Sequence, residues 1–105
     1  GIDAVKPGNT ADDVAQAFWK ILDKYGIEKK SRTGYSIGIG YPPDWGEHTL
    51  NIYKGDNTVL EPNVCFHMIA VMQFGEWGVE ASEAIRVTEK GSELFCNMSK
   101  ELYIK

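Results

Sequence analysis

The sequence predicts an α+β fold in which one amphipathic helix packs on an antiparallel sheet. Apolar residues recur every three or four positions between residues 10 and 26, as they do on one face of a helix. After residue 48 the segments are rich in β-branched, aromatic and alternating residues, and short turns separate them, as in antiparallel strands. With 105 residues, of which 43% are hydrophobic and 25% charged, the chain has the composition of a single globular domain.

The predicted helix has a signal at each end. Thr10 is a suitable N-cap, and Asp13, three residues later, completes the pattern in which cap and carboxylate satisfy free backbone amides. Gly26 supplies the left-handed conformation at which many helices end. The apolar face between these signals consists of Val14, Phe18, Ile21, Leu22 and Tyr25.

Three later segments predict successive strands: HTLNIY at 48–53, NVCFHMIAVMQF at 63–74 and GVEASEAIRVTEKG at 78–91. Side chains alternate between the two faces of a strand. In the second segment one face therefore carries Phe66, Met68, Ala70 and Met72, and the other carries Cys65, His67, Ile69 and Val71. Because both faces are apolar, we expect one to meet the helix and the other to meet a second layer or a lined cavity.

Two polar residues on these strands have open interpretations. His67, among apolar neighbours, is either a hydrogen-bonded core residue or a group that transfers protons. Glu80 is either an exposed acid without a role or, if the two strands pair, a carboxylate that shares a cavity with His67 and orients it for acid or base catalysis.

Two further acids and a tryptophan are also candidates. Glu83 falls on the more apolar face of its strand, so it lies at a sheet edge or is held there for function, because burying a lone carboxylate is costly. Glu47 follows the Pro-Pro turn in GYSIGIGYPPDWGEHTLNI, and it is either a preorganised acid or the start of an exposed strand. Trp45, in the same loop, either covers a small substrate or only packs.

The charge pattern excludes two kinds of partner. The net charge is −4, and the only group of basic residues is Lys29, Lys30 and Arg32, so we expect neither a nucleic acid nor an anionic membrane surface as a partner. No apolar run approaches the length of about 18 residues that a membrane span needs, and no secretory signal opens the chain. We therefore expect a cytoplasmic location.

The two cysteines, Cys65 and Cys96, lie in apolar stretches and lack the C-x-x-C spacing of zinc or redox motifs. We expect both to be buried free thiols rather than a disulfide. The chain begins at Gly1 with residues that read as the interior of a protein, so we expect a piece of a longer one.

Taken in order, four motifs resemble the C-terminal half of the catalytic domain in the creatinase/methionine aminopeptidase family, which has the pita-bread fold. AVKPGNTADDVAQAF resembles the Pro-Gly-x-Thr helix entry, and TGYSIGIG resembles the Thr-Gly-His-Gly-Ile-Gly strand. TVLEPNVCFHM resembles the Leu-Glu-Pro-Gly-Met turn, and GVEASEAIRVTEKGSELF the closing strand and hairpin. The resemblance implies that residues 1–105 form a single partial domain, without the N-terminal half of the fold or the separate N-terminal domain, inactive alone and homodimeric in the intact protein.

The resemblance also bears on metals. Metal-dependent members take one histidine and two glutamates from this half of the domain, and these positions fall on Tyr35, Ile69 and Ser82. None of the three is a competent ligand here, since Ile69 has no donor atom and neutral hydroxyls are poor substitutes for imidazole and carboxylate. The resemblance therefore implies no metal and no other cofactor, and it favours the metal-independent branch of the family.

Within that branch, GYSIGIGYPPDWGE and SEAIRVTE look most similar to ectoine hydrolases, which open a cyclic amidine. This implies a C–N hydrolase acting on a small cyclic amidine or guanidino compound. The candidate catalytic residues are Glu47, Glu80 and His67, and the candidate substrate contacts are Tyr35, Trp45, Ser82 and Glu83. Two alternatives stay open, a metal-dependent Xaa-Pro dipeptidase with unusual ligands and a pita-bread binding module without catalysis.

Overall fold

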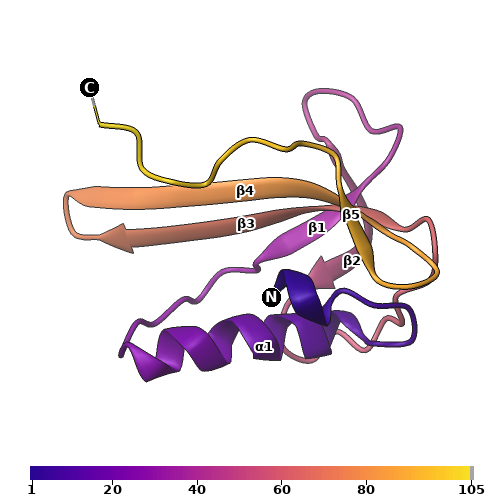
Figure 1. Cartoon of the computed structure of the whole chain (residues 1–105), viewed down its shortest axis with the longest axis horizontal. Coiled ribbons are helices and arrows are strands. Elements are labelled where there is room, and N and C mark those ends of the chain that lie inside the picture. The colour runs from indigo at the N-terminus through magenta and orange to yellow at the C-terminus, as the bar shows by residue number, and fades with distance from the viewer. Residues whose placement is uncertain (105) are drawn as a thin grey trace.

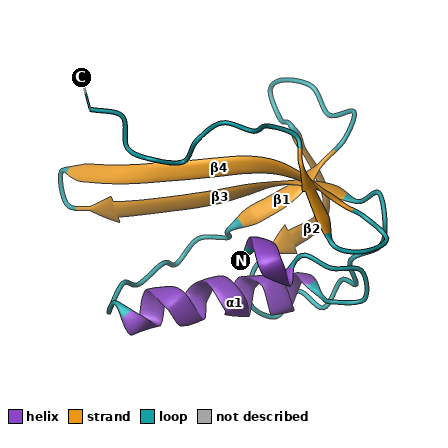
Figure 2. Cartoon of the chain, in the orientation of Figure 1, coloured by secondary structure: helices purple, strands orange, loops and turns teal. Residues whose placement is uncertain are grey.

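The chain folds into one sheet with a helix on one of its faces, and the predicted α+β class is confirmed (Figure 1). A computed structural model describes residues 1–104. A 3-10 helix, η1 (Ile2–Ala4), precedes α1 (Ala11–Lys24), and the strands are β1 (Gly34–Ile37), β2 (Gly46–Ile52), β3 (Cys65–Phe74), β4 (Trp77–Val87) and β5 (Ser92–Leu94). The strands are antiparallel in the order β2-β1-β3-β4-β5, and α1 covers one face of the sheet (Figure 2). Neither helix in residues 1–104 is long and apolar enough to cross a bilayer.

The predicted ends of α1 are confirmed, but its predicted apolar face is wrong in part. Thr10 and Asp13 form the reciprocal cap, and Gly26 has a φ of +66°. Ile21 is 54% exposed and Tyr25 is 68% exposed. Ile21 lies about a quarter turn round the helix from the middle of the buried stripe, and Tyr25 is the C-cap beyond the last turn. The buried stripe is Ala11, Val14, Ala15, Trp19 and Leu22.

The core lies between α1 and the face of the sheet that carries Phe66 and Met68. On β3, Phe66 and Met68 are buried, whereas His67 and Ile69 on the other face are half-buried. The remaining core side chains of the sheet, which come from the other strands, are Leu50, Ile52, Ile85 and Val87. The alternation read from the sequence therefore groups the residues of β3 by face correctly, but it did not say which face meets α1. The face opposite α1 is open in the described residues.

Strands β3 and β4 form a hairpin that extends beyond the rest of the sheet (Figure 1). β1 pairs with β3 only at residues 66–68, and β5 pairs with β4 only at residues 85–87. Further out, within residues 70–83, the two strands have only each other as ladder partners in the described chain. At the tip, Phe74 and Trp77 stack with ring centroids 4.6 Å apart. The hairpin is thus rooted in the sheet at one end, and at the other end neither of its edges pairs with a further strand in the described chain.

After β5 the chain runs back beside β4 without regular structure (Figure 1). The backbone amide of Phe95 donates to the carbonyl of Ala84 at 3.1 Å, and Lys100 pairs with Glu83 further along. Cys96 lies in this segment and is exposed, while Cys65 is half-buried, and both are free thiols. The expectation of free thiols is confirmed, but the expectation of burial is wrong for Cys96, because no layer covers the segment that carries it.

Candidate functional site

The pairing of β1 with β3 places Tyr35 opposite His67. The Tyr35 hydroxyl lies 3.0 Å from Nδ1 of His67, and the two rings meet edge to face with centroids 5.4 Å apart. His67 is therefore hydrogen-bonded, but it is half-buried on the face away from α1 rather than in the core, and its role in proton transfer stays a prediction. The bond occupies Nδ1 and fixes the imidazole plane, so Nε2 is the ring nitrogen that remains available to a ligand.

A cavity of about 480 Å³ opens beside this pair, and Tyr35, Ile37, Gly38, Gly40, Trp45 and His67 line it. Its volume lies within the usual range of small-molecule sites. Trp45 is 59% exposed at the wall, which suits a side chain that covers a ligand better than one that fills a core. The Arg32 guanidinium lies 4.7 Å from the centre of the Tyr35 ring and adds a positive charge close to the cavity.

Glu47 holds the glycine-rich loop in place. Its carboxylate accepts a hydrogen bond from the backbone amide of Gly40, seven residues earlier. A Cβ atom at Gly38 would lie 3.1 Å from Cδ of Glu47, and one at Gly40 would lie 2.9 Å from the carbonyl oxygen of Trp45. Gly40 is thus required by the close approach of the loop's own backbone, whereas a side chain at Gly38 would have to displace Glu47. The Glu47 carboxylate is directed at the backbone of its own loop.

A second acid fixes the end of the same loop, and the sequence analysis did not single it out. Asp44 accepts the Gly46 amide at 2.9 Å, and its other oxygen lies 2.6 Å from Nε2 of His48. The Gly46 hydrogen bond, followed by that of His48, lowers the pKa of Asp44 below its ordinary value. The Asp-x-Gly spacing was the available signal, because aspartate commonly accepts the amide two residues on. Arg32 was not predicted as a residue near the cavity, because no local sequence pattern indicates its contact with Tyr35.

The open sheet face continues from His67 to Ile69 and Ser82. Ile69 lies directly opposite Ser82 in the β3–β4 ladder, and both share the face of His67 and Tyr35. Ser82 is exposed. Of the four predicted substrate contacts, Tyr35 and Trp45 line the cavity beside His67, whereas Ser82 shares that face of the sheet but lies outside the lining. Their contact with a substrate stays a prediction.

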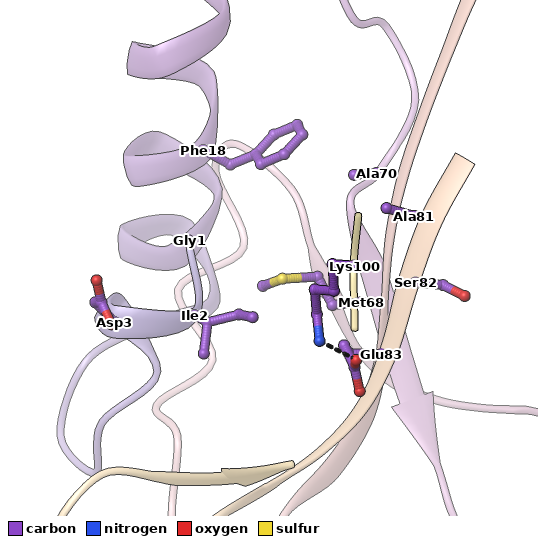
Figure 3. Close-up of a pocket in the computed structure, with 10 residues that line it drawn as sticks. All are labelled: Gly1, Ile2, Asp3, Phe18, Met68, Ala70, Ala81, Ser82, Glu83 and Lys100. Atoms are coloured by element: carbon purple, nitrogen blue, oxygen red, sulfur yellow. Dashed lines mark hydrogen bonds and ion pairs between the residues drawn. The ribbon is translucent and has the colours of Figure 1, made fainter. Parts of the chain in front are cut away.

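The structure does not bring Glu80 or Glu83 to this place. Glu80 lies opposite Val71, four positions along β3 from His67, which is about 13 Å at the usual rise of a strand. Of the two interpretations of Glu80, the shared cavity with His67 is therefore wrong, because the strands pair in a register that separates these side chains, and Glu80 is exposed. Glu83 belongs to the opposite face, where it lines a different cavity with α1 and pairs with Lys100 (Figure 3).

Comparison with known proteins identifies the family. Residues 1–89 match the model of metallopeptidase family M24. The chain belongs to family M24. Among curated M24-like relatives it is 42% identical to an ectoine hydrolase of Halomonas elongata, over all of this chain and 27% of that protein. It is 40% identical to an uncharacterized hydrolase/peptidase, y4tM, of Sinorhizobium fredii, over 99% of this chain and 26% of that protein.

Solved M24 structures confirm the fold. The dipeptidase PepE from Mycobacterium ulcerans superposes with a TM-score of 0.86 at 31% identity, covering 96% of this chain and 27% of that one. The prolidase from Pyrococcus horikoshii OT3 gives a TM-score of 0.86 at 22% identity, covering 97% of this chain and 29% of that one. The expected C-terminal portion of a pita-bread domain is therefore confirmed, and the chain spans about a quarter of the length of these relatives.

The M24 name implies a metal, and the side chains of this chain do not fit one. The three ligand positions implied by the motif resemblance, Tyr35, Ile69 and Ser82, do lie on one face of the sheet. They supply two neutral hydroxyls and one hydrocarbon, and neutral hydroxyls are weak ligands for a divalent ion. Within residues 1–104 no three histidine, cysteine, aspartate or glutamate side chains gather closely enough to hold an ion.

Proposed function

We propose that this chain is the C-terminal portion of an M24 hydrolase that cleaves a C–N bond of a small cyclic amidine or guanidino compound without a metal, with ectoine as the first substrate to test. The observation that carries the proposal is the 42% identity to an ectoine hydrolase over the whole chain. The unsuitable donors at Tyr35, Ile69 and Ser82 support metal independence.

In such a reaction the oxygen of water bonds to the amidine carbon, one ring C–N bond breaks, and the leaving nitrogen gains a proton. His67 is the group we assign to proton transfer, because its Nδ1 is held by Tyr35 at 3.0 Å and the residue lines the cavity. Tyr35 positions the imidazole. Trp45 covers the bound ring, and Ser82, which lies outside the lining of the cavity, contacts only a ligand that extends from His67 towards β4.

Glu47 acts in this proposal through the loop that it fixes, since its carboxylate accepts the Gly40 amide. Glu80 and Glu83 lie away from the His67 cavity, so we give them no part in the reaction. The relatives are about four times longer than this chain, and we propose that the remainder of such a protein supplies the other catalytic groups. The purified chain should therefore be inactive alone, and turnover by it would contradict this statement.

The decisive experiment measures ectoine ring opening by a protein of the relatives' full length that contains this sequence, after exhaustive chelation. An Xaa-Pro dipeptide is assayed in parallel. Ring opening that survives chelation supports the proposal. Ring opening that chelation abolishes and added metal restores contradicts metal independence. The His67→Gln variant should lose turnover while its melting temperature stays within a few degrees of the wild type.

A metal-dependent dipeptidase is the second candidate function, favoured by the 31% identity to PepE. It predicts cleavage of the dipeptide that ceases on chelation. A binding module is the third, and it predicts that ectoine binds without turnover. The dipeptide assay tests the second candidate, and a calorimetric titration of the full-length protein with ectoine, beside the ring-opening assay, tests the third.

We also propose a cytoplasmic homodimer, as the family resemblance implies. Sedimentation equilibrium of the full-length protein at micromolar concentration should give twice the mass of one chain. A monomer at every concentration would contradict the proposed assembly.

A further inference from the structure

A second cavity, of about 490 Å³, lies on the other face of the sheet between η1, α1 and the β3–β4 hairpin (Figure 3). Its volume is within the usual range of sites for small molecules. Most of its wall is hydrocarbon, and the apolar side chains that form it are Ile2, Phe18, Met68, Ala70 and Ala81. Because the sheet separates it from the Tyr35–His67 pair, this cavity is independent of the proposed reaction.

Glu83 brings a carboxylate to the wall of this cavity. Its side chain is only 9% exposed. In Figure 3 the side chains of Asp3 and Ser82 point away from the space, whereas the Lys100 ammonium points towards the Glu83 carboxylate. An ionised carboxylate so far removed from water needs a cation or a set of hydrogen-bond donors close by. Lys100 is the cation that meets this need in the structure.

The ion pair between Lys100 and Glu83 contributes little stability. The Lys100 side chain is 44% exposed, and ion pairs with a partner this exposed contribute little. Lys100 belongs to the segment after β5, which has no helix or strand. Apolar residues of that segment are also exposed, Met98 by 68% and Leu102 by 85%, so their packing does not fasten it. Lys100 can therefore leave Glu83 at small cost, while Glu83 still requires a cation.

We propose that this cavity is a binding site for a small organic cation, namely a primary ammonium group on an aromatic or aliphatic body. The ammonium pairs with Glu83 in place of Lys100, and the body packs against Phe18 and Met68. Lys100 is then an internal competitor that occupies the site when no ligand is present. This inference goes beyond the proposed hydrolase and does not depend on it.

The test titrates a full-length protein that contains this sequence with phenethylamine at pH 7 and, separately, with 2-phenylethanol, which has the same body without the charge. Binding is followed by the NMR signals of the Met68, Ala70 and Ala81 methyl groups, which line the cavity. The amine should shift these signals and bind several-fold more tightly than the alcohol. Lys100→Met, which keeps an apolar stem, should tighten amine binding about two- to five-fold, the range that corresponds to loss of an exposed ion pair.

Lys90→Met is the matched control, because Lys90 is also exposed but lies in the β4–β5 turn away from this cavity. It should leave the affinity unchanged, while Glu83→Gln should lower amine affinity to that of the alcohol. Equal binding of amine and alcohol, shifts confined to other methyl groups, or a Lys100→Met affinity equal to the wild type would each overturn the proposal. If Glu83→Gln fails to fold, the two ligands and the Lys100 variant still decide it.

Discussion

Replacing Gly38 by alanine tests whether Glu47 fixes the glycine-rich loop. The new Cβ atom would lie 3.1 Å from both Cγ and Cδ of Glu47 and 3.2 Å from its Oε1. Ordinary van der Waals contacts of this kind are longer, so Glu47 has to move by a few tenths of an ångström. It cannot do so freely, because its carboxylate accepts the Gly40 amide.

The expected magnitude follows from two opposed effects. Overpacking of this kind costs about 1–3 kcal/mol. Exchange of glycine for alanine at a compatible backbone conformation stabilises by about 0.4–1 kcal/mol, because the unfolded chain loses freedom. Gly38→Ala should therefore destabilise the wild type by about 1 kcal/mol, which lowers the melting temperature of a domain of this size by about 4–8 °C. In a Glu47→Ala background the contact is absent, and the same change should stabilise by about 0.4–1 kcal/mol.

Urea unfolding of the four chains of this cycle gives the coupling energy between Gly38 and Glu47. Gly91→Ala is the control, because a Cβ atom there meets nothing within 4 Å and should show no coupling to Glu47. We expect a coupling of about 1–3 kcal/mol for Gly38. Equal effects of Gly38→Ala in both backgrounds would refute the assignment of Glu47 as the residue that holds the loop.

Three further predictions concern the ends and the surface of the chain. Thr10→Ala should cost about 1 kcal/mol in urea unfolding, because the Thr10 hydroxyl caps the Asp13 amide at 3.1 Å, and Thr10→Ser should restore most of it. Hydrogen bonds from the Thr10 backbone amide and then from its hydroxyl lower the pKa of Asp13. The stability that Asp13 contributes is therefore complete above about pH 4 and is lost as the pH falls through the lower pKa of the folded state. Asp13→Asn should flatten this part of a plot of unfolding free energy against pH. Cys96 should react with Ellman's reagent faster than the half-buried Cys65, and equal rates would contradict the exposure of the C-terminal segment.

Local signals predicted the helix and the faces of the strands. Thr10, Asp13 and Gly26 act within a few residues of themselves, so the ends of α1 could be read from the sequence. The alternation along β3 depends only on strand geometry, so the residues that share a face could also be read. Which of the two faces meets α1 could not be read, because both are apolar.

Contacts that depend on register or on loop closure could not be read in this way. The choice between an exposed Glu80 and one beside His67 stayed open because alternation gives the face of a residue but not its partner on the next strand. Glu47 was weighed as an exposed or a catalytic acid, since nothing local shows that its loop folds back to offer the Gly40 amide. Lys100 was overlooked because the segment that carries it has no periodicity.

Because only one end of the β3–β4 hairpin pairs with the rest of the sheet, the rate of amide hydrogen exchange should change along the two strands. Amides of residues 66–68 lie between two neighbouring strands and over the core, whereas those of residues 70–83 have a single ladder partner. Segments with fewer partners open at lower free energy, so exchange should quicken from the root towards Phe74 and Trp77. Ile69 and Ser82 lie where this gradient begins. Beyond them the backbone opens most easily, so a partner that packs against the hairpin should change the conformation of this outer part of the open face the most.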